Sequence, residues 1–101
     1  MPVYSIWDFH YPSDNSERGL AVAEAIWADM RSFEGYLGHE LVRGLDDPGH
    51  IMVVSRWRSR DCADAALVEY AGNPNAQEAN HLVDRPRDRF VGEVPATSGI
   101  S

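Results

Sequence analysis

Two residue types that carry much of protein chemistry are scarce in this chain. All nine basic side chains are arginines, so there is no lysine, and the one cysteine is Cys62. The lack of lysine excludes Schiff-base catalysis through a lysine amine. The single cysteine excludes an intrachain disulfide and a thiolate metal cluster, and it fits a reducing compartment. We therefore expect a cytoplasmic protein.

Long apolar runs and an excess of positive charge are missing as well. No stretch reaches the roughly 20 apolar residues of a membrane span, and the N-terminus shows no signal-peptide pattern. The net charge is −7, so the chain lacks the basic face that phosphate contacts require. Neither a phosphate-binding glycine loop nor a flavin fingerprint occurs. We expect no membrane partner, no nucleic-acid partner and no cofactor.

The hydrophobic pattern changes between strand and helix periods along the 101 residues. It predicts a strand at 3–10, a helix at 14–33, a hairpin of strands at 36–43 and 50–58, helices at 59–71 and 73–83, and a strand at 87–95. The order βαββαβ is that of an α+β, ferredoxin-like domain, in which helices cover one face of a four-stranded antiparallel sheet. We assign residues 1–95 to this single domain and residues 96–101 to a flexible tail.

The sheet face without helices is predicted to be apolar. Its residues are Tyr4, Ile6, Leu37, Leu41, Met52, Val54 and Val91. An exposed apolar face of this size is unusual on a monomer. A second copy that packs sheet to sheet would cover it, so we predict a two-fold homodimer.

The helix-covered face is predicted to collect many aromatic side chains. The strands contribute Trp7, Phe9, Tyr36, Val53, Ser55, Trp57 and Phe90, and the helices contribute Trp27, Met30, Tyr70 and His81. These residues either fill the core or line a pocket for a flat aromatic ligand. In the second case the binding surface consists of Trp57, Trp7, Trp27, Tyr36, Phe9 and Val53. The sequence leaves both interpretations open.

Few polar residues are candidates for chemistry. His81 is the strongest candidate for acid–base work, because an imidazole titrates near neutrality. Tyr70 and Ser55 could orient or deprotonate a phenol. None of the four histidines has metal-binding helical spacing to another, and we expect His10 near His39 at a subunit interface. We therefore predict no metal site.

Arginines alternate along two segments, at Arg56 and Arg58 and again at Arg85, Arg87 and Arg89. Alternate spacing places each set on one side of an extended chain. There the guanidinium groups could bind an anion or form ion pairs with the sixteen acidic residues.

Four segments carry a resemblance to a known family. They are Gly35–Gly38, the hairpin from Leu41 to Asp47, the strand end Val53–Ser59, and Phe90–Val94. In these segments, over about residues 2–95, the chain resembles the antibiotic-biosynthesis monooxygenase domain, which has a dimeric α+β-barrel fold. The resemblance implies oxidation of polycyclic phenols with dioxygen and no cofactor, oxidation of small quinols, or degradation of haem.

The resemblance is partial at the level of single residues. Trp57 matches a tryptophan that the polyketide-oxidising members keep, whereas Val53 stands where those enzymes use an asparagine. The haem-degrading members use an asparagine at the position of Trp7 and a tryptophan near Ala66, so only a shifted His81 could match them. The resemblance thus implies a cofactor-independent monooxygenase for a phenolic or quinol-like compound and dioxygen. A non-enzymatic ligand-binding or stress-associated dimer, and a haem protein, are the alternatives.

Overall fold

The computed structural model describes residues 2–95, and the predicted tail at 96–101 lies outside them. Within this range the strands are β1 (Val3–His10), β2 (Tyr36–Arg43), β3 (His50–Trp57) and β4 (Asp88–Gly92). They form an antiparallel sheet in the order β2-β3-β1-β4. The α-helices of the described chain are α1 (Ser16–Asp29), α2 (Arg60–Tyr70) and α3 (Pro74–Leu82), and 3-10 turns at Ser13–Asn15 and Met30–Ser32 flank α1.

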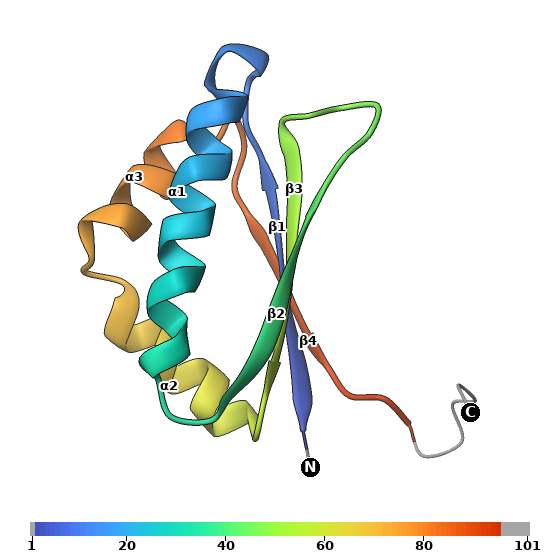
Figure 1. Cartoon of the computed structure of the whole chain (residues 1–101), viewed down its shortest axis with the longest axis vertical. Coiled ribbons are helices and arrows are strands. Elements are labelled where there is room, and N and C mark those ends of the chain that lie inside the picture. The colour runs from blue at the N-terminus through green and yellow to red at the C-terminus, as the bar shows by residue number, and fades with distance from the viewer. Residues whose placement is uncertain (1, 96–101) are drawn as a thin grey trace.

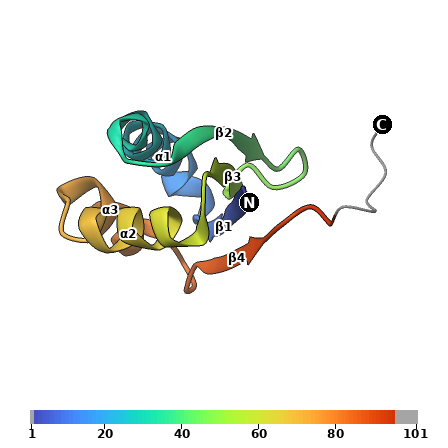
Figure 2. The ribbon, with the colours of Figure 1, turned by 90° about the horizontal axis from the view of Figure 1, so that it is seen from below.

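The helices lie together on one side of the sheet (Figure 1). Seen from below, the same three helices leave the opposite side of the strands uncovered (Figure 2). This is the predicted α+β, ferredoxin-like arrangement with helices on one face.

A few residues set where the elements begin. Ser59 caps α2 by accepting a hydrogen bond from the backbone N–H of Cys62 at 3.2 Å. Asn73 caps α3, and Pro74 occupies its first turn. Gly35 has a φ of +83° between α1 and β2, and a Cβ there would lie 2.5 Å from the Cβ of Cys62. Glycine is therefore required at this turn both for its backbone conformation and for space.

The core lies between the helices and the two central strands, β1 and β3. Side chains alternate inward and outward along these strands, as predicted. On the inward side Phe9 is 4% exposed, Trp57 is 2% exposed, and Ile51 and Val53 are fully buried. The helices complete the core with Val22, Ile26, Trp27, Met30, Ala63, Ala66, Tyr70, Ala76 and Ala79.

A bulge in β2 changes the predicted faces of that strand. Its register with β3 shifts between Tyr36 and Gly38, so Leu37 is an inserted residue. Beyond the bulge, His39 and Leu41 face the helices, and Leu41 packs against the core. The prediction that Leu41 lies on the open face was therefore wrong.

The predicted neighbour of His10 was also wrong. β1 pairs with β3 rather than with β2, and His10 lies directly opposite His50. The two imidazole rings stack with their centroids 4.1 Å apart on the open face, whereas His39 lies on the helix side.

The faces of β4 are the reverse of those predicted. Val91 lies opposite Ser5 and faces the helices, while Phe90 lies opposite Ile6 on the open face and is 65% exposed. A one-residue difference in register exchanges the two faces of a strand. β4 also ends at Gly92, before the predicted boundary.

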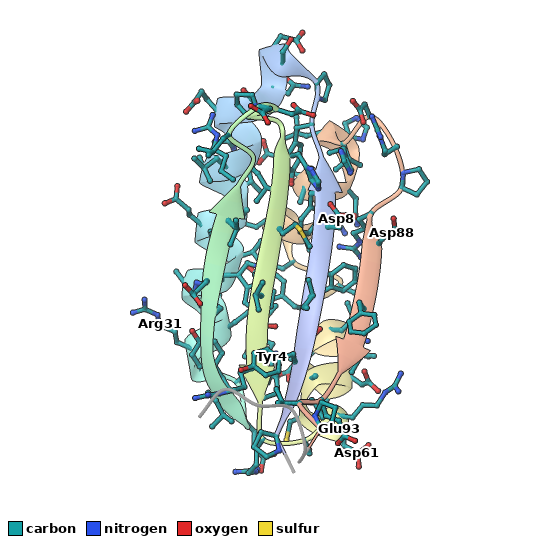
Figure 3. The ribbon with its side chains drawn as sticks, turned by 90° about the vertical axis from the view of Figure 1, so that its right-hand side faces the viewer. Tyr4, Asp8, Arg31, Asp61, Asp88 and Glu93 are labelled. Carbon is teal, nitrogen blue, oxygen red and sulfur yellow. The ribbon has the colours of Figure 1, made fainter. Side chains whose placement is uncertain are left out.

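The open face of the sheet, seen in Figure 3, carries two kinds of side chain. Its apolar part consists of Tyr4, Ile6, Val42, Met52, Val54 and Phe90. Asp8 and Asp88 lie beside each other above Tyr4 in Figure 3. None of the helices within residues 2–95 is long and apolar enough to span a bilayer.

Candidate functional site

A cavity of about 70 Å³ lies between the sheet and the helices. Its aromatic wall is formed by Trp7, Phe9, Trp27, Trp57 and Tyr70. Exposed Ala71 and Asn80 also line it and mark its solvent side. The space exceeds what one water molecule requires, and its wall suits a small aromatic ring.

Short side chains on the helices keep this cavity open. Ala63 and Ala66 of α2 and Ala76 of α3 are buried and line it. Longer side chains at these positions would fill the space between helix and sheet, because protein interiors are close-packed. The aromatic residues therefore serve both as core and as cavity wall, so the two interpretations of the sequence are compatible.

Hydrogen bonds along the central strands fix Trp57. Its Nε1 donates to Ser55 Oγ at 3.0 Å, and Ser55 Oγ donates to the backbone carbonyl of Ser5 at 2.6 Å. The Tyr36 ring packs edge-on against Trp57 with 5.7 Å between centroids. Ser55 is fully buried and does not line the cavity, so the structure places its hydroxyl where it orients Trp57.

Two arginines approach the cavity where Trp7 forms its wall. The guanidinium carbon of Arg87 lies 4.5 Å from the Trp7 ring centroid, and that of Arg89 lies 5.6 Å from it. Arg89 is engaged elsewhere, because it donates to Ser5 Oγ at 3.1 Å and to Asp64 Oδ1 at 2.9 Å. Arg89 therefore holds β4 against β1 and α2.

Arg87 differs from its neighbour because it lines the cavity itself. No carboxylate of residues 2–95 forms an ion pair with it. Burial lowers the pKa of Arg87, yet a guanidinium stays protonated near neutrality. The cavity wall thus presents a positive charge that can hold an anionic oxygen.

Tyr70 contributes its ring to the wall, while its hydroxyl donates to Asp29 Oδ2 at 2.6 Å. Burial and this hydrogen bond raise the pKa of Tyr70 to about 12. Tyr70 therefore keeps its proton near neutral pH, which does not suit a general base.

Besides Ser55, three predicted site residues do not line the cavity. His81 is exposed on α3 and does not line it. Tyr36 contacts Trp57 from outside the cavity, and its hydroxyl pairs with His39 Nδ1 at 2.5 Å. Val53 is fully buried in the core. Their direct roles at a site stay predictions.

Sequence reasoning missed Asn80 and the alanines of the wall. The spacing of Ala63 and Ala66, one helical turn apart, was an available signal for a helix face with little bulk. Arg87 belonged to an alternating set that predicted either an anion site or ion pairs. Its contact with Trp7 depends on where β4 joins the sheet, which the sequence does not specify.

Solved structures of similar fold include SnoaB, a cofactor-independent oxygenase from Streptomyces nogalater, with a TM-score of 0.83, 18% identity and 95% of each chain covered. A protein from Mycobacterium tuberculosis has a TM-score of 0.74 and 24% identity, with 98% of this chain and 100% of that chain covered. These identities show the fold alone. No curated protein matches the chain in sequence. The sequence model of the antibiotic biosynthesis monooxygenase family matches residues 2–81, and the chain therefore belongs to this family.

Proposed function

We propose that this protein is a monooxygenase that oxidises a phenolic or quinol-like compound with dioxygen. The observation that carries the proposal is an aromatic cavity with the guanidinium of Arg87 in its wall. The rings of Trp7 and Trp57 can hold a flat substrate, and Arg87 can bind its ionised oxygen. Family membership, and a structural neighbour described as a cofactor-independent oxygenase, support the reaction class.

The proposed reaction balances without a resident cofactor. With a phenol, one oxygen atom of dioxygen enters the ring as the second carbonyl of a quinone, and the other leaves as water. With a quinol, dioxygen takes up the two hydroxyl hydrogens and leaves as hydrogen peroxide. In both cases the substrate loses two hydrogens, and all the electrons that dioxygen accepts come from the substrate. The protein then has to place the two reactants together and exclude water.

Substrate ionisation is the step that Arg87 would assist. A phenolate gives up an electron more readily than a phenol, and a nearby positive charge lowers the pKa of a bound phenol. Tyr70 remains protonated, and His81 lies outside the cavity. We therefore propose that the substrate binds as its phenolate, or loses its proton to water at the mouth beside Asn80.

Oxygen consumption tests the proposal. We expect uptake with single-ring phenols and hydroquinones, and a loss in kcat/KM of about 10- to 100-fold in Arg87→Gln, the range for a hydrogen bond to a charged group. Arg85→Gln is the matched control, because Arg85 is exposed and pairs with Asp84 at 3.1 Å. Absence of uptake across the panel, or equal losses in the two variants, would refute the proposal.

Binding without oxidation is the second candidate. It is favoured because Val53 lies where similar enzymes orient the substrate with an asparagine, and because no histidine or carboxylate is among the residues that line the described cavity. Flat phenols should then quench the fluorescence of the three tryptophans at one ligand per chain, without oxygen uptake. The lining of the described cavity also has no histidine or cysteine, the proximal haem ligands of globins and P450 enzymes, and this argues against haem.

We also propose that the chain forms a homodimer through the open face of the sheet. Phe90 is 65% exposed there on the edge strand β4, and Tyr4, Ile6, Met52 and Val54 continue the apolar surface across β1 and β3. A contiguous apolar surface of this kind is typical of protein interfaces. The single cysteine continues to favour a cytoplasmic location.

A further inference from the structure

Three metal-ligating side chains converge on the open face, on the opposite side of the sheet from the aromatic cavity. Asp8 and His10 are two residues apart on β1 and therefore point to the same face. His50 begins β3 and lies directly opposite His10. One ligand atom from each of the three residues lies within 4.8 Å of the other two.

The ligand atoms of this group lie close enough together to share one metal ion. Asp8 Oδ1 lies 2.6 Å from His50 Nε2 and 3.4 Å from His10 Nε2. In a tetrahedral site with bonds of about 2.0 Å, ligand atoms are roughly 3.3 Å apart. The contact with His50 is a hydrogen bond, but the contact with His10 is too long for a good one. Two imidazoles are thus directed at a single carboxylate oxygen, and only one is satisfied by it.

A second carboxylate adds to the negative charge at this place. Asp88 lies opposite Asp8 on β4, and Figure 3 shows both on the open face. Like charges directly opposite each other destabilise a sheet. A cation between these strands would remove the repulsion, and Asp88 could hold a water bound to it.

We propose that Asp8, His10 and His50 form a binding site for one divalent transition-metal ion per chain. Two imidazoles and one carboxylate suit zinc and the first-row ions around it better than magnesium or calcium, which prefer all-oxygen sites. The three residues are half-buried in the single chain, and three ligands leave a fourth coordination position for water. The site is independent of the cavity, and its failure would leave the proposed oxygenase reaction unaffected.

The experiment uses the tag-free full chain after treatment with a chelator. Titration with Zn²⁺ in a calorimeter should give one saturable site per chain. In a parallel NMR titration, the imidazole signals of His10 and His50 should shift, while those of His39 and His81 stay in place. Because this second measurement uses the unaltered chain, it does not depend on whether a variant folds.

Variants then assign the ligands. His50→Gln and His10→Gln should each weaken Zn²⁺ binding by at least about 100-fold, because the loss of even an outer-shell partner costs 10- to 100-fold. Asp88→Asn should weaken it by about 10-fold. His81→Gln is the matched control, since this histidine is exposed on α3 outside the group, and its affinity should equal that of the unaltered chain. Absence of saturable binding, or binding that both ligand variants retain, would overturn the proposal.

Discussion

The two faces of the sheet are built from the same strands and yet have opposite characters. Along β1, Ser5, Trp7 and Phe9 face the helices, where Trp7 stacks beside Phe9 at 6.1 Å between centroids. The alternate residues Ile6 and Asp8 face away from the helices and remain half-exposed. One face therefore encloses an apolar cavity, while the other offers an uncovered apolar surface and a group of ionisable residues. Because neighbouring positions belong to different faces, single substitutions can test each face separately.

The largest expected effect belongs to the covered face. Trp57→Ala should lower the free energy of unfolding by about 4 kcal/mol, because it leaves a large void in the core. Phe90→Ala on the open face should change the unfolding of the separated chain by less than about 1 kcal/mol, since its side chain is 65% exposed. Urea unfolding at low protein concentration measures both. Equal losses would contradict the assignment of these rings to different faces.

The next effect concerns association through the open face. Phe90→Asp should weaken dimerisation by about 2 kcal/mol or more, roughly 30-fold, because it replaces an exposed aromatic ring of the proposed interface with a charge. Val68→Asp is the control, since Val68 is 77% exposed on α2, on the helix side of the sheet. Sedimentation velocity should show dissociation of the first variant alone. A monomeric parent chain, or dissociation of both variants, would refute the proposed interface.

Removal of the hydroxyl should change the free energy of unfolding in opposite directions at two buried tyrosines. Tyr11 Oη is buried and finds no hydrogen-bond partner among residues 2–95, so Tyr11→Phe should stabilise the fold by about 1 kcal/mol. Tyr70 donates to Asp29, so Tyr70→Phe should destabilise it by about 1–2 kcal/mol. Thermal and urea unfolding of the two variants give the comparison.

The alkaline side of the stability profile gives a second test of the same pair. Burial raises the pKa of Tyr11 to about 12, and burial with the bond to Asp29 does the same for Tyr70. The unfolded chain ionises first, near pH 10, so the stability from these groups is present below that pH and is lost as the pH rises to about 12. Each Phe variant should therefore lose less stability over that interval than the parent chain. An unchanged slope in both would contradict the raised pKa values.

Periodicity and turn residues predicted the order of the elements and the inward faces of β1 and β3, because these strands alternate without interruption. These signals could not predict which side chains of β2 and β4 face the helices, because a shift of one residue in register exchanges the two faces of a strand. The bulge at Leu37 turned Leu41 inward, and the register of β4 exchanged Phe90 and Val91. The conformation of Gly38, with a φ of +151°, fits the irregularity there, and a glycine inside a strand is a weak signal of one.

The candidate site was predictable to the extent that it follows from strand alternation. Trp7, Phe9 and Trp57 line the cavity because they occupy inward positions of central strands. The group of Asp8, His10 and His50 required strand pairing and exact register, which place residues 42 positions apart in contact. A ferredoxin-like order already implies that the first strand lies beside the third, but hydrophobic periodicity does not fix which residues stand opposite each other.

The smallest expected effect tests a histidine of the covered face. His39 packs against Trp27 with 5.5 Å between centroids, and burial, with a smaller effect of Arg31, lowers the pKa of His39 below its usual 6.5. The unfolded chain then takes up this proton more readily than the folded one, so the stability is present above pH 6.5 and is lost as the pH falls through the folded pKa. His39→Gln should therefore flatten the fall in melting temperature below about pH 6.5, whereas His81→Gln controls for the loss of an exposed imidazole. If the melting temperature of His39→Gln falls with pH as steeply as that of the parent chain, the burial of His39 does not affect stability, and His39 is not an energetic part of the helix-covered core.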